Sequence, residues 1–396
     1  MSGRVKGFRF AGVHGGVKKG DALDLGLIAA DQPATAAGVF TTNRVRAAPV
    51  VISERRLLGG SCQAVLVNSG NANACTGRQG RQTALALTRA TAAVLGIPQA
   101  LVVPASTGVI GVQLPGEKMM SSLAPLVDDL SEAGAARFSR AILTTDQGPK
   151  VARAEVKVGW TTCRILGIAK GAGMIHPNMA TTLGFVTTDA SVHRTTLRRI
   201  LGRAAEQTFN RVTVDGDTST NDSIYALASG AATGRPVVEK SAAGRRFTEA
   251  LTEVLEALAK KIVSDGEGAE HLVRIEVRGT KSDAEAVQIA RTIASSQLVK
   301  TALHGCDPNW GRILAAAGRS GAGFNPDHVS MKIGQVSIFD EGVPIMTPKS
   351  EAKAASVMKR REYVIGLTVG RGRGVGHYWT CDLGHEYVRI NADYRS

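Results

Sequence analysis

The sequence predicts an α+β fold with a larger first domain and a smaller α/β second domain. Strand-like and helix-like segments are interleaved without the regular spacing of strand–helix–strand units, which disfavours a doubly wound parallel sheet. The 396 residues are 43% apolar, enough to form two hydrophobic cores. Around residues 231–241 the composition shifts to small residues, glycine, proline and charge, which is typical of a boundary. We therefore expect domains over residues 1–235 and 236–396.

Hydrophobic periodicity locates the elements of the first domain. Apolar residues at helical spacing, followed by Gly96, predict a helix over residues 82–95. Further helices are predicted at 117–132 and 193–209. Short apolar and β-branched runs predict strands at 39–42, 50–52, 64–67 and 101–103, and a hairpin that joins 152–158 to 163–168.

The second domain is expected to begin with an amphipathic helix over residues 246–263, whose apolar side chains share one face. Strands are predicted at 271–278, 363–369 and 387–390, and a helix at 283–298. The segment Gly370–Gly376 is similar to a nucleotide-binding glycine fingerprint and to an arginine–glycine RNA-binding segment. Because no helix pattern follows it, we interpret it as a tight loop between two strands.

The composition argues against several classes of protein. No apolar run approaches the roughly 18–20 residues that cross a bilayer, so no membrane partner is expected. The first 21 residues contain scattered basic residues and no apolar segment of signal-peptide length, so a cytoplasmic location is expected. The five cysteines lie far apart without a CxxC pair, which indicates reduced thiols and no metal site.

The net charge of +14 is a reason to consider nucleic acid or an anionic small molecule as a partner. The basic residues are spread along the chain, however, and aromatic residues make up only 4% of it. Stacking platforms for single-stranded nucleic acid are therefore scarce. A solvated basic surface is the preferred interpretation, and no nucleic-acid partner is expected.

The most informative stretch is Lys170–Leu183 (KGAGMIHPNMATTL), which leads from a cation and small residues to a predicted strand. If the bond between Ala180 and Thr181 were cut, Thr181 would carry both a hydroxyl and a free α-amine. That pairing activates an N-terminal threonine as a nucleophile. From these residues alone, a turn that leads into a buried strand is the alternative.

Two further loops have compositions that suit a site. Residues 104–111 (PASTGVIG) follow a predicted strand, and such a loop can point successive backbone N–H groups at one oxygen, as an oxyanion hole requires. Residues 68–77 (NSGNANACTG) favour turns with local side-chain hydrogen bonds. From these residues alone, an ordinary strand–turn is the preferred interpretation of residues 104–111, and a plain surface loop is the alternative for residues 68–77. The acidic segment 213–222 lacks the spacing of a calcium-binding loop, so no calcium is expected there.

Segments along nearly the whole chain together resemble the ornithine acetyltransferase (ArgJ) family, the bifunctional glutamate N-acetyltransferases of the cyclic arginine pathway. In chain order they are NSGNANACTG (68–77), STGVIG (106–111), TTD (144–146), KGAGMIHPNMATTL (170–183), VDGDTSTND (214–222), DGEG (265–268), DPNWGR (307–312) and YVRINADYRS (387–396).

The resemblance implies a precursor that cleaves itself between Ala180 and Thr181, giving an α chain of residues 1–180 and a β chain that starts at residue 181. It implies that Thr181 takes the acetyl group of N2-acetylornithine, releases ornithine and passes the acetyl group to glutamate. Synthesis of N-acetylglutamate from acetyl-CoA is a further expectation, with acetyl-CoA as a substrate and no bound cofactor. The implied assembly is α2β2.

The resemblance also assigns roles to residues. The oxyanion-hole positions match Thr107 and Gly108, and the substrate-binding positions match Thr144, Lys170, Thr181, Glu267, Asn391 and Ser396. Lys170 can pair with the substrate α-carboxylate, and Glu267 with the ornithine ammonium group. Ser106, Thr182 and His176 receive no chemical role, and His176 is expected to be a packing residue.

The sequence departs from the commoner family pattern at three places. Thr182 stands where methionine is usual, Ala269–His271 (Ala-Glu-His) where Ala-Thr-Lys is frequent, and Ser396 where threonine is common. Only the second bears on the site, since it changes the charge near Glu267.

Two other functional classes remain as alternatives. An amidase or aminopeptidase on the same scaffold would keep Thr181 and use water as the acceptor, but it would not need Lys170, Glu267 and the Asn391/Ser396 tail together. Their joint presence favours transfer. A basic nucleic-acid-binding protein would leave Lys170–Leu183 unexplained.

Overall fold

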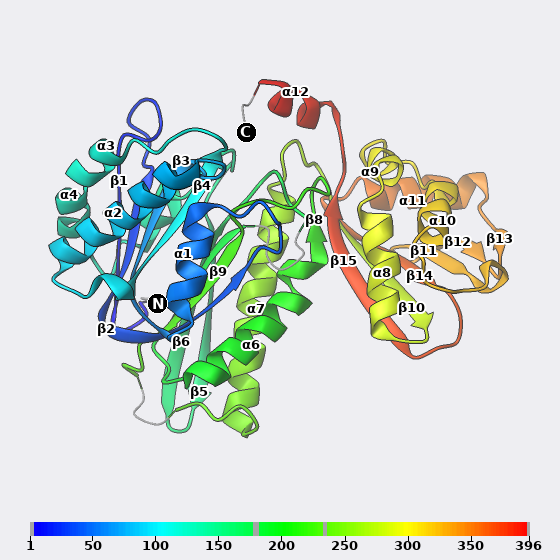
Figure 1. Ribbon diagram of the computed structural model, residues 1–396. Coiled ribbons are helices and arrows are strands. Elements are labelled where there is room, and N and C mark those ends of the chain that lie inside the picture. Colours follow the sequence, from blue (N-terminus) through cyan, green and yellow to red (C-terminus); the bar gives the residue numbers. More distant parts are fainter. Residues whose placement is uncertain (1–3, 177–181, 233–235, 394–396) are drawn as a thin grey trace.

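The computed structural model describes residues 4–176, 182–232 and 236–393, which form two lobes with one mixed β-sheet each (Figure 1). Helices pack against both sheets, and parallel and antiparallel pairs occur in each. The α+β class is therefore confirmed. Among the described residues, no helix is both long and apolar enough to cross a membrane.

The first sheet has the strand order β4-β3-β2-β9-β7-β6-β5, with β1 also paired to β2. Its strands are β1 (Phe8–Val13), β2 (Leu25–Phe40), β3 (Ser61–Asn71), β4 (Val102–Val109), β5 (Lys150–Val158), β6 (Thr161–Lys170), β7 (Leu183–Thr188) and β9 (Ser223–Ala228). The interior strand β7 runs antiparallel to β6 and parallel to β9. Its first residue, Leu183, lies opposite Lys170 on one side and Ser223 on the other.

Helices cover the first sheet because their apolar residues repeat at helical spacing. Helices α6 (Arg194–Gln207) and α7 (Ala242–Ser264) bury one apolar face each against β5, β6 and β2. A second core cluster joins α1 (Ala48–Leu57) and α5 (Ala135–Ala141) to the sheet. A third cluster packs α2 (Gly77–Leu95), α3 (Gly116–Ser121) and α4 (Leu123–Asp128) near the outer strands. The 3-10 turn η1 (Gln99–Leu101) directly precedes β4.

The second sheet has the order β13-β12-β11-β14-β10-β15-β8. Its strands are β8 (Val212–Thr213), β10 (Leu272–Thr280), β11 (Ser330–Ile333), β12 (Val336–Asp340), β13 (Val343–Pro344), β14 (Glu362–Thr368) and β15 (Gly374–Cys381). One face is buried beneath α8 (Asp283–Ala294), α9 (Gln297–His304), α10 (Trp310–Gly318) and α11 (Pro348–Met358), with the 3-10 turn η3 (Pro326–His328) before β11. The edge strand β8 belongs to the chain of the first lobe, so its pairing with β15 joins the lobes.

The expected boundary at residue 235 stays a prediction, and the packing bears on where it should be drawn. Helix α7 follows that point but shares a core cluster with the first sheet. The second cluster begins only at Val273, on β10. We therefore propose a boundary at about Leu272, where the chain enters the second sheet.

Several elements differ from the sequence-based expectation. Residues 50–52 lie in helix α1, which starts with Pro49 in its first turn, and not in a strand. Residues 387–390 belong to helix α12 (His385–Asp393), where Glu386 and Arg389 pair at helical spacing. The single helix expected over 117–132 is two short helices, α3 and α4. Of the strand predicted at 39–42, residues 39–40 are the end of the long strand β2, and residues 41–42 lie beyond it.

Candidate functional site

A cavity of about 210 Å³ opens among loops of the first lobe, beside the end of β4, the end of β6 and helix α12. Six residues that the sequence analysis singled out line it together: Thr107, Gly108, Thr144, Lys170, Glu267 and Asn391. Ala180, Thr181 and Ser396 lie outside the described residues. The structure therefore places all six candidate residues that it describes around one cavity.

The segment proposed as an oxyanion hole is held in a fixed conformation. Gly108 has a φ of +130°, and a Cβ there would lie 2.3 Å from the carbonyl carbon of Gly70, so no larger residue fits. Gly70 lies opposite Gly108 across the parallel pair of β3 and β4. The amide Nδ2 of Asn221 donates to the carbonyl oxygens of Ser106, at 2.8 Å, and Ala72, at 2.6 Å. Thr107 and Gly108, which were expected in a loop, lie at the end of strand β4, and the buried Asn221 fixes this end of the strand.

Lys170 lies at the end of β6, where its side chain is buried and directed at Thr144. Its Nζ donates to Thr144 Oγ1 at 2.5 Å and lies 3.5 Å from Asp146 Oδ2. The backbone N–H groups of Thr144 and Gly171 donate to the same carboxylate, at 2.9 and 2.6 Å. Thr144 and Lys170 are therefore positioned by one buried acid.

Burial alone would raise the pKa of the Asp146 carboxyl, but the positive charges of Lys170 and Lys150 outweigh it and hold the pKa well below its usual range. Lys150 donates to Asp146 Oδ1 at 2.7 Å and also pairs with Asp265. Asp265 precedes Glu267 by two residues and accepts from the backbone N–H of Gln147. The ionised Asp146 is thereby linked to the loop of Glu267.

Glu267 supplies the carboxylate of the cavity. Its side chain is buried, and the amide Nδ2 of Asn391, from α12, donates to its Oε2 at 2.7 Å. Its backbone N–H donates to the carbonyl of Ala172 at 3.0 Å. A Cβ on Gly173 would lie 2.5 Å from Oε2, so this glycine makes room for the carboxylate. Asn391 and Glu267, 124 residues apart, act as a pair.

A second, half-buried acid, Asp215, holds the chain that leads toward the expected cleavage bond. Its carboxylate accepts from the backbone N–H groups of Met174, at 2.6 Å, and Ile175, at 2.9 Å. Burial raises its pKa, against the effect of these hydrogen bonds. Tyr387 of α12 lines the cavity close by, and burial together with Asp215 and Glu267 raises the pKa of its hydroxyl.

Two residues without an assigned chemical role flank the undescribed residues 177–181. His176 Nδ1 lies 3.1 Å from Thr213 Oγ1, and Arg291 Nε donates to His176 Nε2 at 3.1 Å. Burial, followed by the charge of Arg291, lowers the pKa of His176 to about 4, so the ring is neutral near pH 7. These contacts join the lobes, as expected of a packing residue. Thr182 is buried, and its carbonyl accepts from the N–H of Ser223.

Asp146, Asp215, Asn221 and Tyr387 are site residues to which the sequence analysis gave no role. Asp146, Asp215 and Asn221 fall inside the segments TTD and VDGDTSTND, which was the available signal. Their roles depend on partners that are distant in the sequence, such as Ser106 for Asn221, 115 residues away, which a linear pattern does not reveal. Ser106 has a structural role, since its Oγ donates a hydrogen bond to Asn68 Oδ1 at 2.6 Å.

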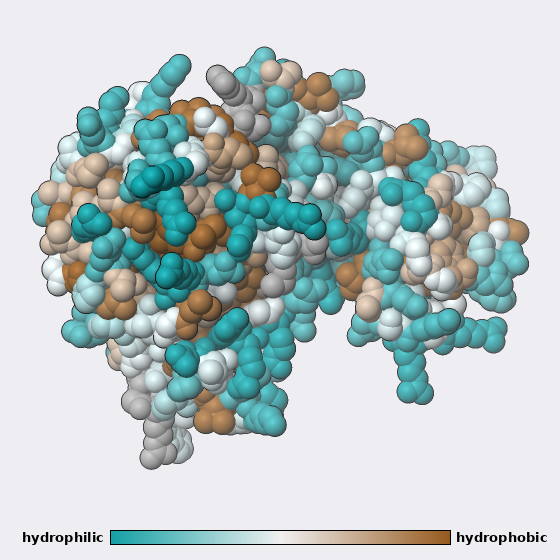
Figure 2. Space-filling view, viewed as in Figure 1, coloured by the Kyte–Doolittle hydropathy of each residue, from teal (hydrophilic) through white to brown (hydrophobic). Residues whose placement is uncertain are grey.

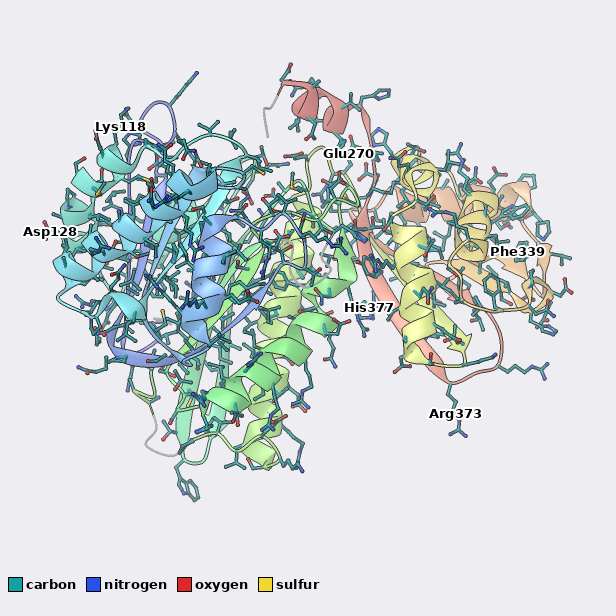
Figure 3. The ribbon with its side chains drawn as sticks, viewed as in Figure 1. Lys118, Asp128, Glu270, Phe339, Arg373 and His377 are labelled. Atoms are coloured by element: carbon teal, nitrogen blue, oxygen red, sulfur yellow. The ribbon has the colours of Figure 1, made fainter. Side chains whose placement is uncertain are left out.

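One group of described residues has donor atoms close enough to hold a metal ion: Glu270, His304 and Asp382, within 4.8 Å of one another. Glu270 lies near the segment that leads to α12, outside the cavity (Figure 3). Asp382 Oδ1 accepts from the backbone N–H groups of Glu270 and His271, both at 2.8 Å, and Oδ2 lies 2.8 Å from His304 Nδ1. Hydrogen bonds explain this grouping, and we assign no metal to it.

Comparisons with known proteins give a consistent result. A model of the ArgJ family matches residues 9–396. The arginine biosynthesis bifunctional protein ArgJ of Shouchella clausii is 48% identical over 394 residues, covering 99% of this chain and 95% of that protein. The protein of the same name from Syntrophotalea carbinolica is 47% identical, covering 99% and 100%. A crystal structure of the arginine biosynthesis bifunctional protein ArgJ from Bacillus halodurans is 42% identical with a TM-score of 0.51, covering 53% of this chain and 98% of that one.

Proposed function

The chain belongs to the ArgJ family, and we propose that it is a self-processed acetyltransferase that moves the acetyl group of N2-acetylornithine to glutamate. The products are ornithine and N-acetylglutamate, so the enzyme serves arginine biosynthesis. The observation that carries this proposal is one cavity that combines a buried cation, Lys170, a buried carboxylate, Glu267, and Thr107 and Gly108 at the end of β4.

This arrangement of charge is complementary to N2-acetylornithine. Lys170 would bind the substrate α-carboxylate. Thr144 would lie beside that carboxylate, because the Lys170 Nζ donates a hydrogen bond to the Thr144 hydroxyl. Glu267 would bind the side-chain ammonium, with Asn391 holding the carboxylate in place. We include Ser396 with Asn391 as a binding residue because both belong to the C-terminal segment YVRINADYRS. The acetyl amide would then face Thr107 and Gly108 at the end of β4.

The proposed reaction uses Thr181 as both nucleophile and base. Its Oγ attacks the acetyl carbonyl carbon while its α-amine takes the hydroxyl proton, and Thr107 and Gly108 stabilise the resulting oxyanion. Collapse breaks the C–N bond, the α-amine returns the proton to the leaving nitrogen, and ornithine departs from acetyl-Thr181. The α-amine of glutamate then attacks the ester, and the proton it loses returns to Thr181 Oγ.

Cleavage at Ala180–Thr181 would generate the free amine that this chemistry needs. A β chain from Thr181 to Ser396 comprises slightly more than half of the sequence, a share similar to the 53% that the Bacillus halodurans chain covers. We propose that two such α/β pairs form an α2β2 assembly. We also propose that acetyl-CoA serves as a second acetyl donor and that the enzyme uses no bound cofactor. A cytoplasmic location fits the five cysteines, which are all unpaired.

The experiment that tests the proposal measures ornithine release from N2-acetylornithine with and without glutamate, using purified processed enzyme. We expect steady release only with glutamate, in step with N-acetylglutamate formation, because the acetyl-enzyme needs an amine acceptor. A second series replaces N2-acetylornithine with acetyl-CoA. Steady ornithine release at the same rate without glutamate would instead identify the amidase or aminopeptidase, in which water is the acceptor.

A further inference from the structure

A second cavity, of about 460 Å³, lies between the two lobes and shares no described lining residue with the candidate active site. Figure 2 shows the indentation between the lobes, bordered mainly by hydrophilic residues. Strand β10 buries its apolar residues beneath the helices of the second sheet. The alternate residues Arg274, Glu276 and Arg278 face the other way and line the cavity, as does His377 of β15 (Figure 3).

Arg211 closes the cavity from the first lobe. It ends the 3-10 turn η2 (Phe209–Arg211) and directly precedes β8, whose Val212 pairs with Trp379 of β15. This register sets Arg211 beside the stretch of β15 that carries His377. The Arg211 Nε is buried without a hydrogen-bond partner, and no ion pair of its guanidinium is found among the described residues.

Arg274, on the opposite wall of the cavity, also makes fewer hydrogen bonds than its guanidinium can donate. Its Nε is also buried without a hydrogen-bond partner in the described chain, although its Nη1 lies 3.2 Å from Glu276 Oε1. Arg278 shares that carboxylate, with Nη2 at 3.6 Å from Oε2. One acid therefore serves two arginines, and two buried N–H groups still need an acceptor, either water or a bound anion.

Positive charge is concentrated at the His377 end of the cavity. Burial, followed by the charges of Arg274 and Arg211, lowers the pKa of His377 to about 4. Two more carboxylates line the cavity: Asp283, which accepts from the N–H of Val375 at 2.8 Å, and Glu256 of α7. Glu276, the carboxylate shared by Arg274 and Arg278, lies opposite His377 in the pairing of β10 with β15. Arg211 is therefore the guanidinium at this end of the cavity for which the described residues supply no carboxylate.

We propose that this cleft is an oxyanion-binding site, in which Arg211 and Arg274 hold a carboxylate or phosphate group of a small molecule next to His377. Guanidinium groups bind such groups through paired, charge-assisted hydrogen bonds. Ligand cavities also occur preferentially between domains. Because Arg211 comes from the first lobe and Arg274 from the second, the bound group bridges the two.

Calorimetric titration of the processed enzyme with inorganic phosphate, and separately with acetate, tests the site. We expect saturable binding at this site, with Kd raised about tenfold or more in Arg211→Gln, because a charged hydrogen-bond partner is lost. The matched control is Arg203→Gln, which removes the same charge from α6, where Arg203 pairs with Glu239 away from the cavity. The control should bind like the wild type. Tighter binding of phosphate or of acetate identifies the ligand class.

A second measurement needs no variant. In the wild-type protein, the ring resonances of His377 should titrate at a higher pH when the anion is bound, since a nearby negative charge favours the imidazolium. The site is refuted if neither anion binds saturably, if Arg211→Gln and the wild type bind equally, or if saturating anion leaves the titration of His377 unchanged. Water would then be the partner of the two arginines.

Discussion

At the scale of single residues, Asp146 organises the candidate site, because Lys170, Lys150 and the backbone of Thr144 all converge on its carboxylate. We expect Asp146→Asn to lower the free energy of unfolding at pH 7 by about 3–5 kcal/mol, since two lysines lose a buried partner. Misplacement of Lys170 should also lower kcat/KM for N2-acetylornithine by about 10²-fold. Denaturant unfolding and the ornithine-release assay measure the two effects. Unchanged stability would show that the carboxylate is not the anchor.

The pH dependence of that stability difference has a definite sign. The folded pKa of Asp146 lies below its unfolded value, so its contribution is fully present above about pH 4 and is lost as the pH falls further. The gap between wild type and Asp146→Asn should therefore stay constant from pH 8 to about 5 and narrow below about 4. Asp31→Asn, at an exposed pair with Arg9, is the control and should shift stability by less than about 0.5 kcal/mol.

At the scale of elements, helix α12 reaches the cavity although none of its described residues is buried. Its contacts there are those of Tyr387 and Asn391. Asn391→Ala should raise KM for N2-acetylornithine about tenfold, by freeing the Glu267 carboxylate, with little change in stability. Val388→Ala, on the exposed face of the same helix, should leave KM unchanged. If both substitutions change KM equally, Asn391 has no specific role in substrate binding and α12 only shields the cavity from solvent.

The helices and strands also show which parts of the fold can be predicted from sequence patterns. Helix α7 and the hairpin of β5 and β6 were predictable because periodicity and a glycine turn act locally. Helices α1 and α12 were missed because their β-branched and aromatic residues favour strands. In α1 the burial of Val50 and Ile52 overrode that preference. In α12, which has no buried residue among those described, the helix is supported by the pair of Glu386 and Arg389. The loop motifs of the site were visible in the sequence. The roles of Asp146 and Asn221 were not, because they depend on contacts such as Asn221 with Ser106, 115 residues away.

At the scale of the whole molecule, the expected cleavage falls where both future chains share one sheet and one core. Strand β6 would belong to the α chain, and β7 and β9 to the β chain, yet β7 pairs with both neighbours along its length. Two core clusters of the first lobe also combine residues from both sides of the expected cleavage bond. Cleavage should therefore leave the two chains associated.

This leads to a prediction about processing that separates covalent from non-covalent structure. Under denaturing conditions, purified protein should give two fragments, the larger starting at Thr181, whereas native mass spectrometry should show them held together. Thr181→Ala should remain a single chain and lose acetyl transfer, because it lacks the hydroxyl that attacks both the peptide bond and the substrate. Thr182→Ala should still be cleaved, since the free amine and the hydroxyl must belong to one residue. A wild-type chain that stays at full-length mass after prolonged incubation, or acetyl transfer retained in Thr181→Ala, would place the nucleophile elsewhere.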